Sequence, residues 1–160
     1  MNVEIRPASA DDAELIHRLS RQAWCGTIDA SSSLFAETVD HVAGVLARGG
    51  GFILLVDGEP SGSVRHFPSA DDPTSWEVKR LGVLAPLRRR GLGAALMGAV
   101  DGAARRSGVR SLRLGIRTDQ PQLIPFYRGL GFEIDDSVRL ASQHQATTST
   151  ITMSRRLPSE

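Results

Sequence analysis

Residues 88–93 read Arg-Arg-Arg-Gly-Leu-Gly and stand at the start of a helix-forming segment. The first N–H groups of a helix have no acceptor within the helix, and the helix dipole makes that end positive. Glycine has no Cβ, so the backbone can approach an anion closely. These residue types in this order predict a cradle for a phosphate or pyrophosphate, formed by the amides of residues 89–94 with charge added by Arg88 or Arg89.

Two other phosphate-binding motifs do not fit this stretch. A dinucleotide-binding fingerprint needs a small residue where Leu96 stands and an acidic residue about 20 positions further on. Neither is present, because the acidic residue after the next predicted strand is Asp119. A Walker A loop needs Gly-Lys-Ser or Gly-Lys-Thr, which is also absent. The stretch is therefore neither of these motifs.

The elements that must position the cradle alternate along the chain. Apolar patterning predicts strands over residues 3–6, 52–56, 60–67, 76–84, 109–117, 132–138 and 147–153. It predicts helices after a cap at Ser9 and over residues 34–48, 92–106 and 122–130. The helix between the strands near residues 80 and 113 implies that these strands run parallel, whereas the hairpins imply antiparallel pairs. We expect an α/β (α+β) fold with a mixed, twisted, six- to seven-stranded sheet and about four helices on both faces.

Composition limits the class of protein. A chain of 160 residues fits one domain over residues 1–160. With 19 basic and 18 acidic residues the net charge is +1, so the totals do not suggest a nucleic-acid binder. The one cysteine, Cys25, excludes an internal disulfide, and no two histidines have metal-ligand spacing, so no metal is predicted. Without an apolar run near 18 residues or an apolar leader, we expect a soluble, cytoplasmic protein with no membrane contact.

Two segments resemble the GCN5-related N-acetyltransferase (GNAT) superfamily. Residues 88–93 match its acetyl-CoA signature, Arg/Gln-x-x-Gly-x-Gly/Ala, and residues 80–86 (Arg-Leu-Gly-Val-Leu-Ala-Pro) resemble the strand before that signature. Residues 124–132 (Ile-Pro-Phe-Tyr-Arg-Gly-Leu-Gly-Phe) resemble the tyrosine-bearing helix of the family and its Gly-Phe exit. The predicted order of elements fits the family over nearly the whole chain.

The resemblance implies the GNAT fold and acetyl-CoA as co-substrate. In the family, a bulge near Val83 and Leu84 splays two strands apart, and pantetheine lies in the gap as an additional strand. Gln120 stands where the family often has asparagine, and Leu123 replaces a common alanine. The residues expected to bind the cofactor are Leu81, Val83, Arg88, Arg89, Arg90, Gly91, Gly93, Ala94, Gln120 and Phe126.

Tyr127, the one tyrosine of the chain, would by this resemblance lie near the sulfur of CoA and protonate the leaving thiolate. The ordinary pKa of tyrosine, about 10, keeps the phenol protonated at neutral pH, as a general acid requires. The alternative is an aromatic side chain that packs beside Phe126.

Glu77, on the predicted strand 76–84, is the first candidate for the general base that removes a proton from the acceptor amine. The alternatives are a sheet carboxylate paired with Lys79 or Arg80, or a carboxylate that only binds the substrate ammonium. His66, on the neighbouring predicted strand, could line the same cleft, although a strand histidine is more often satisfied by hydrogen bonds. Water could also carry the proton.

The predicted function is that of an N-acetyltransferase (EC 2.3.1 type) in which an amine attacks acetyl-CoA directly in a ternary complex. The acceptor is a small-molecule amine or a peptide N-terminus, and residues 24–29, including Asp29, would wall its site by resemblance. One alternative is a non-catalytic acyl-CoA-binding or sensing module. Another, nucleic-acid binding through the arginine runs, lacks interleaved aromatic residues. If the protein forms an oligomer, the arrangement predicted is a homodimer through the C-terminal strands.

Overall fold

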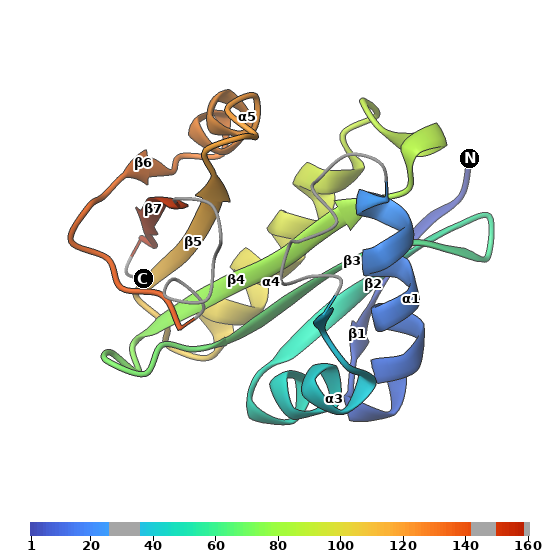
Figure 1. Cartoon of the computed structure of the whole chain (residues 1–160), viewed down its shortest axis with the longest axis horizontal. Helices are drawn as coiled ribbons and strands as arrows, with labels where there is room; N and C mark the ends of the chain where they lie inside the picture. Colours follow the sequence, from blue (N-terminus) through green and yellow to red (C-terminus); the bar gives the residue numbers. More distant parts are fainter. Residues whose placement is uncertain (26–35, 142–149, 159–160) are drawn as a thin grey trace.

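The computed structural model describes residues 1–25, 36–141 and 150–158 (Figure 1). Seven strands form one sheet in the order β1-β2-β3-β4-β5-β7-β6. Neighbouring strands pair antiparallel except for β4 and β5, which are parallel. The strands are β1 (Val3–Ala8), β2 (Gly50–Val56), β3 (Glu59–Pro68), β4 (Ser75–Val83), β5 (Ser111–Arg117), β6 (Glu133–Ile134) and β7 (Thr150–Arg156). The predicted mixed, six- to seven-stranded sheet is confirmed.

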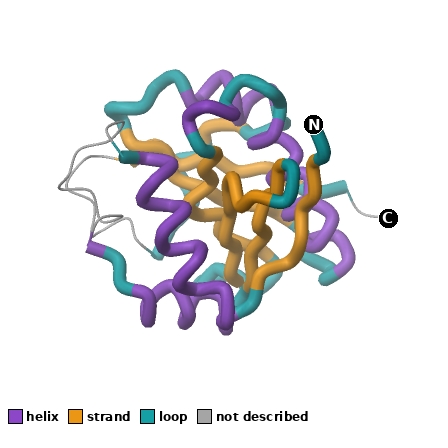
Figure 2. The backbone as a smooth tube through the Cα atoms, turned by 90° about the vertical axis from the view of Figure 1, so that its right-hand side faces the viewer, coloured by secondary structure: helices purple, strands orange, loops and turns teal. Residues whose placement is uncertain are grey.

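Helices cover both faces of this sheet (Figure 2). Figure 1 shows α1 (Ala13–Trp24) and α3 (Val39–Arg48) in front of the strands and α4 (Leu92–Arg106) behind them. A shorter helix, α5 (Leu123–Gly129), follows β5. Two 3₁₀ turns, η1 (Ala10–Asp12) and η2 (Ala85–Leu87), precede α1 and α4. The helices predicted over residues 92–106 and 122–130 are confirmed, the first with identical limits.

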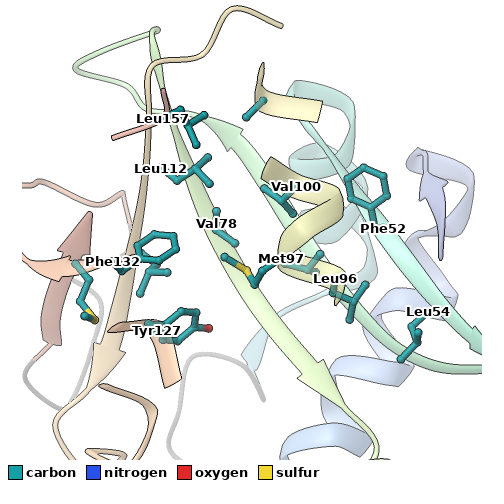
Figure 3. Packing of buried hydrophobic residues seen from close by; sticks show 14 of the residues in the cluster. Phe52, Leu54, Val78, Leu96, Met97, Val100, Leu112, Tyr127, Phe132 and Leu157 are labelled. Carbon is teal, nitrogen blue, oxygen red and sulfur yellow. The ribbon is translucent and has the colours of Figure 1, made fainter. Parts of the chain in front are cut away.

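Each face of the sheet has its own apolar core, because successive strand residues point to opposite faces. In β2, Ile53 packs with Ile16, Leu19 and Val42 of α1 and α3. Phe52 and Leu54 belong to the larger cluster around α4, drawn in Figure 3. This double burial explains why the sequence of β2 is continuously apolar.

Several strands and helices begin or end at residues other than those predicted. β1 continues through Pro7 to Ala8, because β1 is an edge strand where the missing N–H of proline costs no ladder bond. The strand predicted over residues 132–138 shrinks to β6, and the last strand runs further, to Arg156. α3 is described from Val39, where the side chain of Thr38 caps the helix by accepting from the N–H of His41. No helix in the described ranges is long and apolar enough to cross a membrane.

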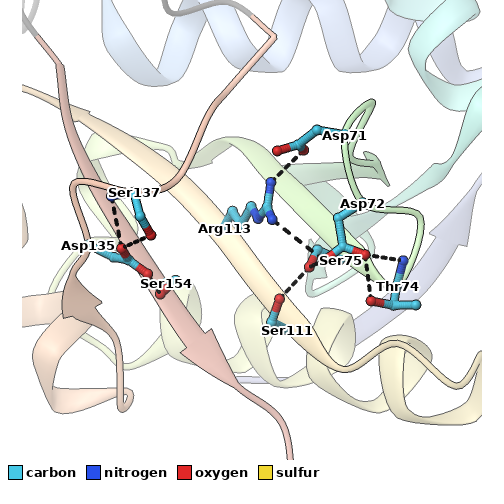
Figure 4. Close-up of polar contacts among 9 residues, drawn as sticks. All are labelled: Asp71, Asp72, Thr74, Ser75, Ser111, Arg113, Asp135, Ser137 and Ser154. Atoms are coloured by element: carbon cyan, nitrogen blue, oxygen red, sulfur yellow. Dashed lines mark hydrogen bonds and ion pairs between the residues drawn. The ribbon is translucent and has the colours of Figure 1, made fainter.

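β4 diverges from β5 part-way along its length. The two strands pair only from Ser75 to Glu77, opposite residues 111–113. Polar contacts hold this paired end, among them a hydrogen bond between the hydroxyls of Ser75 and Ser111 (Figure 4). Beyond Glu77 the strands separate, so β4 presents an unpaired edge to a gap in the sheet (Figure 1).

A bulge in β4 accompanies the gap. Ser63 pairs with Gly82 and Arg65 with Lys79, so two residues of β4, Arg80 and Leu81, oppose the single residue between them on β3. The backbone of Arg80 has a φ of 61°, in the left-handed region. The bulge expected from the resemblance is therefore present, slightly earlier in the strand than Val83.

Candidate active site

The first turn of α4 has the geometry of an anion cradle. Gly91 precedes the helix with a φ of 76°, and no side chain caps the turn. The amides of residues 92–94 have no acceptor among the described residues. Arg89 also has a positive φ, 65°, which is uncommon for a residue with a Cβ and is often found at functional sites. These amides and the positive end of α4 suit the predicted pyrophosphate.

The three arginines before α4 differ in their surroundings. Arg88 donates from Nε to the carbonyl of Val83 at 3.1 Å and from Nη2 to the carbonyl of Ala23. Its guanidinium therefore joins the ends of β4 and α1. Arg89 is exposed, and Nη1 of the exposed Arg90 lies 3.8 Å from the sulfur of Met1. Of the two arginines expected to add charge to the cradle, Arg89 has the side chain that is not committed to backbone carbonyls.

An apolar wall adjoins the cradle. A Cβ at Gly93 would lie 3.5 Å from Cζ of Phe126 and 4.0 Å from Cδ2 of Leu81. The start of α4, helix α5 and the bulge of β4 therefore meet at this point. The structure thus brings together Leu81, Gly93 and Phe126, three of the residues predicted to bind the cofactor. The neighbouring predicted residues Val83 and Ala94 are half-buried.

Glu77 is buried at the point where β4 leaves β5, with 4% of its surface exposed. Its Oε1 accepts the N–H of Ala141 at 2.7 Å. Its Oε2 is buried and has no hydrogen-bond partner in the described part of the chain. Burial raises the pKa of this carboxyl, and the N–H of Ala141 and nearby cations only partly oppose that rise. Glu77 forms no ion pair with Lys79 or Arg80, so it is not the paired sheet carboxylate that was one of its alternative roles.

Tyr127 is buried beside the same two strands. Its ring makes edge contacts with Phe126 and Phe132, at centroid distances of 5.0 and 5.7 Å. Figure 3 shows the ring between β5 and β4, in the cluster that contains Val78 and Leu112. Burial raises the pKa of the phenol, and its hydroxyl has no partner among the described residues. A phenol in this setting keeps its proton at neutral pH.

The candidates Glu77 and Tyr127 lie on opposite faces of the sheet. Trp76 and Val78, the neighbours of Glu77 in β4, pack in the α4-side cluster with Tyr127. Glu77 must therefore point to the other face. Phe67, its partner on β3, lies on that face, 5.0 Å beneath the guanidinium of Arg48 of α3. Glu77 thus flanks the point where β4 and β5 separate from one face of the sheet, and Tyr127 lies on the other face.

A comparison with models of known protein families identifies the family of this chain. The family model described as "Acetyltransferase (GNAT) family" matches residues 16–132. The chain belongs to the GNAT acetyltransferase family. Comparison with curated proteins finds no significant match.

Solved structures share the GNAT fold at low sequence identity. The PaiA N-acetyltransferase of Thermoplasma acidophilum, in complex with coenzyme A, superposes with a TM-score of 0.77 at 16% identity, covering 98% of this chain and 99% of that one. Ard1 of Thermoplasma volcanium superposes with a TM-score of 0.76 at 23% identity, covering 99% of both chains. The ribosomal-protein-S18-alanine N-acetyltransferase of Escherichia coli gives 0.76 at 16% identity, covering 99% of this chain and 96% of that one.

The placement of His66 corrects an expectation about this GNAT chain. Its ring stacks on Trp76 at a centroid distance of 4.2 Å, so it lies on the α4 face, opposite to Glu77. Burial lowers the pKa of His66 to about 4. The expectation that His66 and Glu77 line one cleft is wrong, because their side chains project from opposite faces of adjacent strands.

A buried ionic cluster on the Glu77 face has no counterpart in the prediction. Arg65, with 0% exposure, places Nη1 2.8 Å from Oε1 of Glu37 and donates from Nη2 to the hydroxyl of Ser20 at 2.8 Å. Nε of Arg80 lies 3.7 Å from Oε2 of Glu37. The available signal was Arg65 itself, a charged residue inside an otherwise uncharged stretch of strand. Its partner Glu37 precedes α3 and could not be placed from local pattern.

The remaining predictions concern other parts of the GNAT fold. Gln120 is buried after β5 and accepts a hydrogen bond from the side chain of Gln122. Within the described ranges, no group of three His, Cys, Asp or Glu side chains is placed to hold a metal. Asp29 and most of the predicted acceptor wall lie outside the described residues, as does His144.

Proposed function

We propose that this GNAT acetyltransferase acetylates a primary amine, supplied by a small molecule or a peptide N-terminus, by direct attack in a ternary complex. The observation that carries the proposal is the buried Oε2 of Glu77, which has no hydrogen-bond partner among the described residues and lies where β4 and β5 separate. Acetyl-CoA supplies a thioester carbonyl that a neutral amine can attack. The remaining chemistry is proton transfer by residues of the chain.

Each candidate residue has a role that fits its surroundings. The α4 amides and Arg89 hold the pyrophosphate, and the wall of Leu81 and Phe126 adjoins the gap between the strands. Oε2 of Glu77 accepts the proton of the acceptor ammonium, a transfer that its raised pKa favours. Tyr127 keeps its proton until the sulfur of CoA departs, then donates it.

Release of CoA thiol tests the proposal directly. Wild-type protein is incubated with acetyl-CoA and a panel of primary amines, amino acids and short peptides, and free thiol is measured. Acceptor-dependent release that Glu77→Gln reduces by a factor of about 100 or more is expected for a general base. Tight acetyl-CoA binding in calorimetry without release to any amine would instead identify the chain as an acyl-CoA-binding or sensing module.

A further inference from the structure

Three cationic side chains surround one carboxylate on the Glu77 face of the sheet. Arg65 and Lys79 are direct partners across β3 and β4, so their side chains share a face. Lys79 is two residues from Glu77 in β4 and therefore shares the face of Glu77 as well. Arg80, at the bulge, reaches the same carboxylate as Arg65, that of Glu37. Arg65, Lys79 and Arg80 are called the cation cluster below.

Lys79 is the member of the cation cluster that forms no ion pair with any described residue. It is the one lysine of the chain, and it forms no hydrogen bond or ion pair in the described ranges although it is half-buried. Burial and the charges of Arg80 and Arg65 lower the pKa of Lys79 to about 8, against the weaker attraction of Glu37 and Glu77. An ammonium placed so is expensive to keep unless an anion joins it.

Glu77 does not supply that anion. One of its oxygens accepts from the N–H of Ala141, and its own pKa is raised, so it holds its negative charge less firmly than an ordinary carboxylate. Glu37 is already within ion-pair distance of Arg65 and Arg80. Among the described residues, Lys79 therefore has no anionic partner, and a group from outside the protein can supply one.

We propose that the cation cluster, through Lys79, binds an anionic group on the acceptor, so that the substrate is an amine that also carries a carboxylate or phosphate. This inference rests on the proposed N-acetyltransferase function. Residues two apart in a strand are separated by about 7 Å. One small molecule can therefore present its amine to Glu77 and its anion to Lys79.

Acceptor pairs that differ only in the anionic group test the inference. An amino acid, its carboxamide and the matching aminoalkyl phosphate are compared as acceptors for wild type, Lys79→Met and Lys79→Arg. Wild type is expected to prefer one of the two anionic acceptors at least tenfold in kcat/KM over the carboxamide. Whichever anion is preferred identifies the anionic group of the substrate.

The variants separate anion binding from a structural role. At a pH above the acidic limb of the pH–rate profile, where Glu77 is deprotonated with or without the charge of Lys79, Lys79→Met is expected to raise KM for the anionic acceptor at least tenfold. Under the same conditions kcat/KM for the carboxamide should stay within twofold, and Lys79→Arg should retain most of the preference. Arg105→Met removes a positive charge from the exposed end of α4. It is expected to change neither KM for the anionic acceptor nor kcat/KM for the carboxamide. Equal losses for both acceptors in Lys79→Met, or no anion preference in wild type, would overturn the inference.

Two further measurements do not depend on turnover. At pH 8, calorimetry in two buffers of different ionisation enthalpy should show proton uptake when the anionic acceptor binds, because the anion restores the charge of Lys79. Lys79→Met should abolish that uptake. Intact-mass analysis after incubation with acetyl-CoA alone should leave Lys79 unmodified, since an acetylated Lys79 has no charge and would contradict anion binding. Failure of every amine to release CoA would refute the proposed function, whereas turnover without anion preference refutes only this inference.

Discussion

Arg65 of β3 and Lys79 of β4 are direct partners across the sheet, yet Glu37 pairs with Arg65, and no carboxylate of the described residues pairs with Lys79. Burial makes the positive charge of both side chains costly. Glu37 compensates that cost for Arg65, and no described residue compensates it for Lys79. Removing the charge of Lys79 and removing the charge of Glu37, which balances Arg65, should therefore have opposite effects on the stability of the fold.

Lys79→Met is expected to stabilise the protein at pH 7 by about 2 kcal/mol, since methionine keeps the apolar stem and removes an unpaired charge. The pKa of Lys79 is about 8 in the folded chain, below its ordinary 10.5, so below pH 8 both states carry the charge and the full penalty applies. As the pH rises from 8 to 10.5, Lys79 loses its proton in the folded state before it does so in the unfolded state. The free energy of unfolding of wild type therefore rises, and the advantage of Lys79→Met shrinks. Urea denaturation at pH 7 and pH 10 measures this difference. A variant less stable than wild type at pH 7 would contradict the prediction.

Glu37→Gln is expected to destabilise the fold by about 3–5 kcal/mol, because it leaves the fully buried Arg65 without a countercharge. Thermal or urea unfolding at pH 7 provides the measurement. Glu133→Gln is the matched control, since its side chain is 77% exposed and its ion pair with Arg128 spans 4.0 Å, so a change within about 0.5 kcal/mol is expected. Similar stability of the two variants would show that Glu37 does not balance Arg65.

The sequence predicts those features that are set by neighbouring residues. Helix α4 has the predicted limits because the glycines before it and the Ser107-Gly108 exit are local signals. The placement of His66 depends instead on the register of β3 against β4 next to the loop that joins them, where His66 lies opposite Val78 and Glu77 lies opposite Phe67. The pair of Glu37 and Arg65 joins segments far apart in the chain, so no local pattern could reveal it.

Tyr127→Phe is expected to lower kcat by a factor of 100 or more if the phenol protonates the departing sulfur. The ring contacts with Phe126 and Phe132 do not involve the hydroxyl, so folding and acetyl-CoA affinity should persist. Steady-state CoA release and calorimetric titration with acetyl-CoA measure the two quantities separately. Unchanged kcat would remove the acid role, and lost affinity would point to a packing role instead.

Glu77 is expected to set the acidic limb of the pH–rate profile. A base works only when deprotonated, so kcat/KM should fall as the pH drops through the pKa of Glu77, which burial holds above its ordinary 4.5. Glu77→Gln should remove this limb. His66→Ala should retain it, because His66 lies on the opposite face and has a pKa of about 4. A profile that loses its acidic limb in His66→Ala alone would transfer the base role to His66.

Gly91→Ala is expected to weaken acetyl-CoA binding through the backbone alone. A Cβ at Gly91 meets nothing within 4 Å, but the φ of 76° costs a residue with a Cβ about 1 kcal/mol or more. Relaxation of that strain turns the first amides of α4 away from the pyrophosphate. Gly98→Ala is the matched control, because its site in α4 is equally open but has no positive φ, so it should stabilise the helix by about 0.5–1 kcal/mol. Calorimetric titration with acetyl-CoA decides: equal affinity in the two variants would exclude this turn from the cradle.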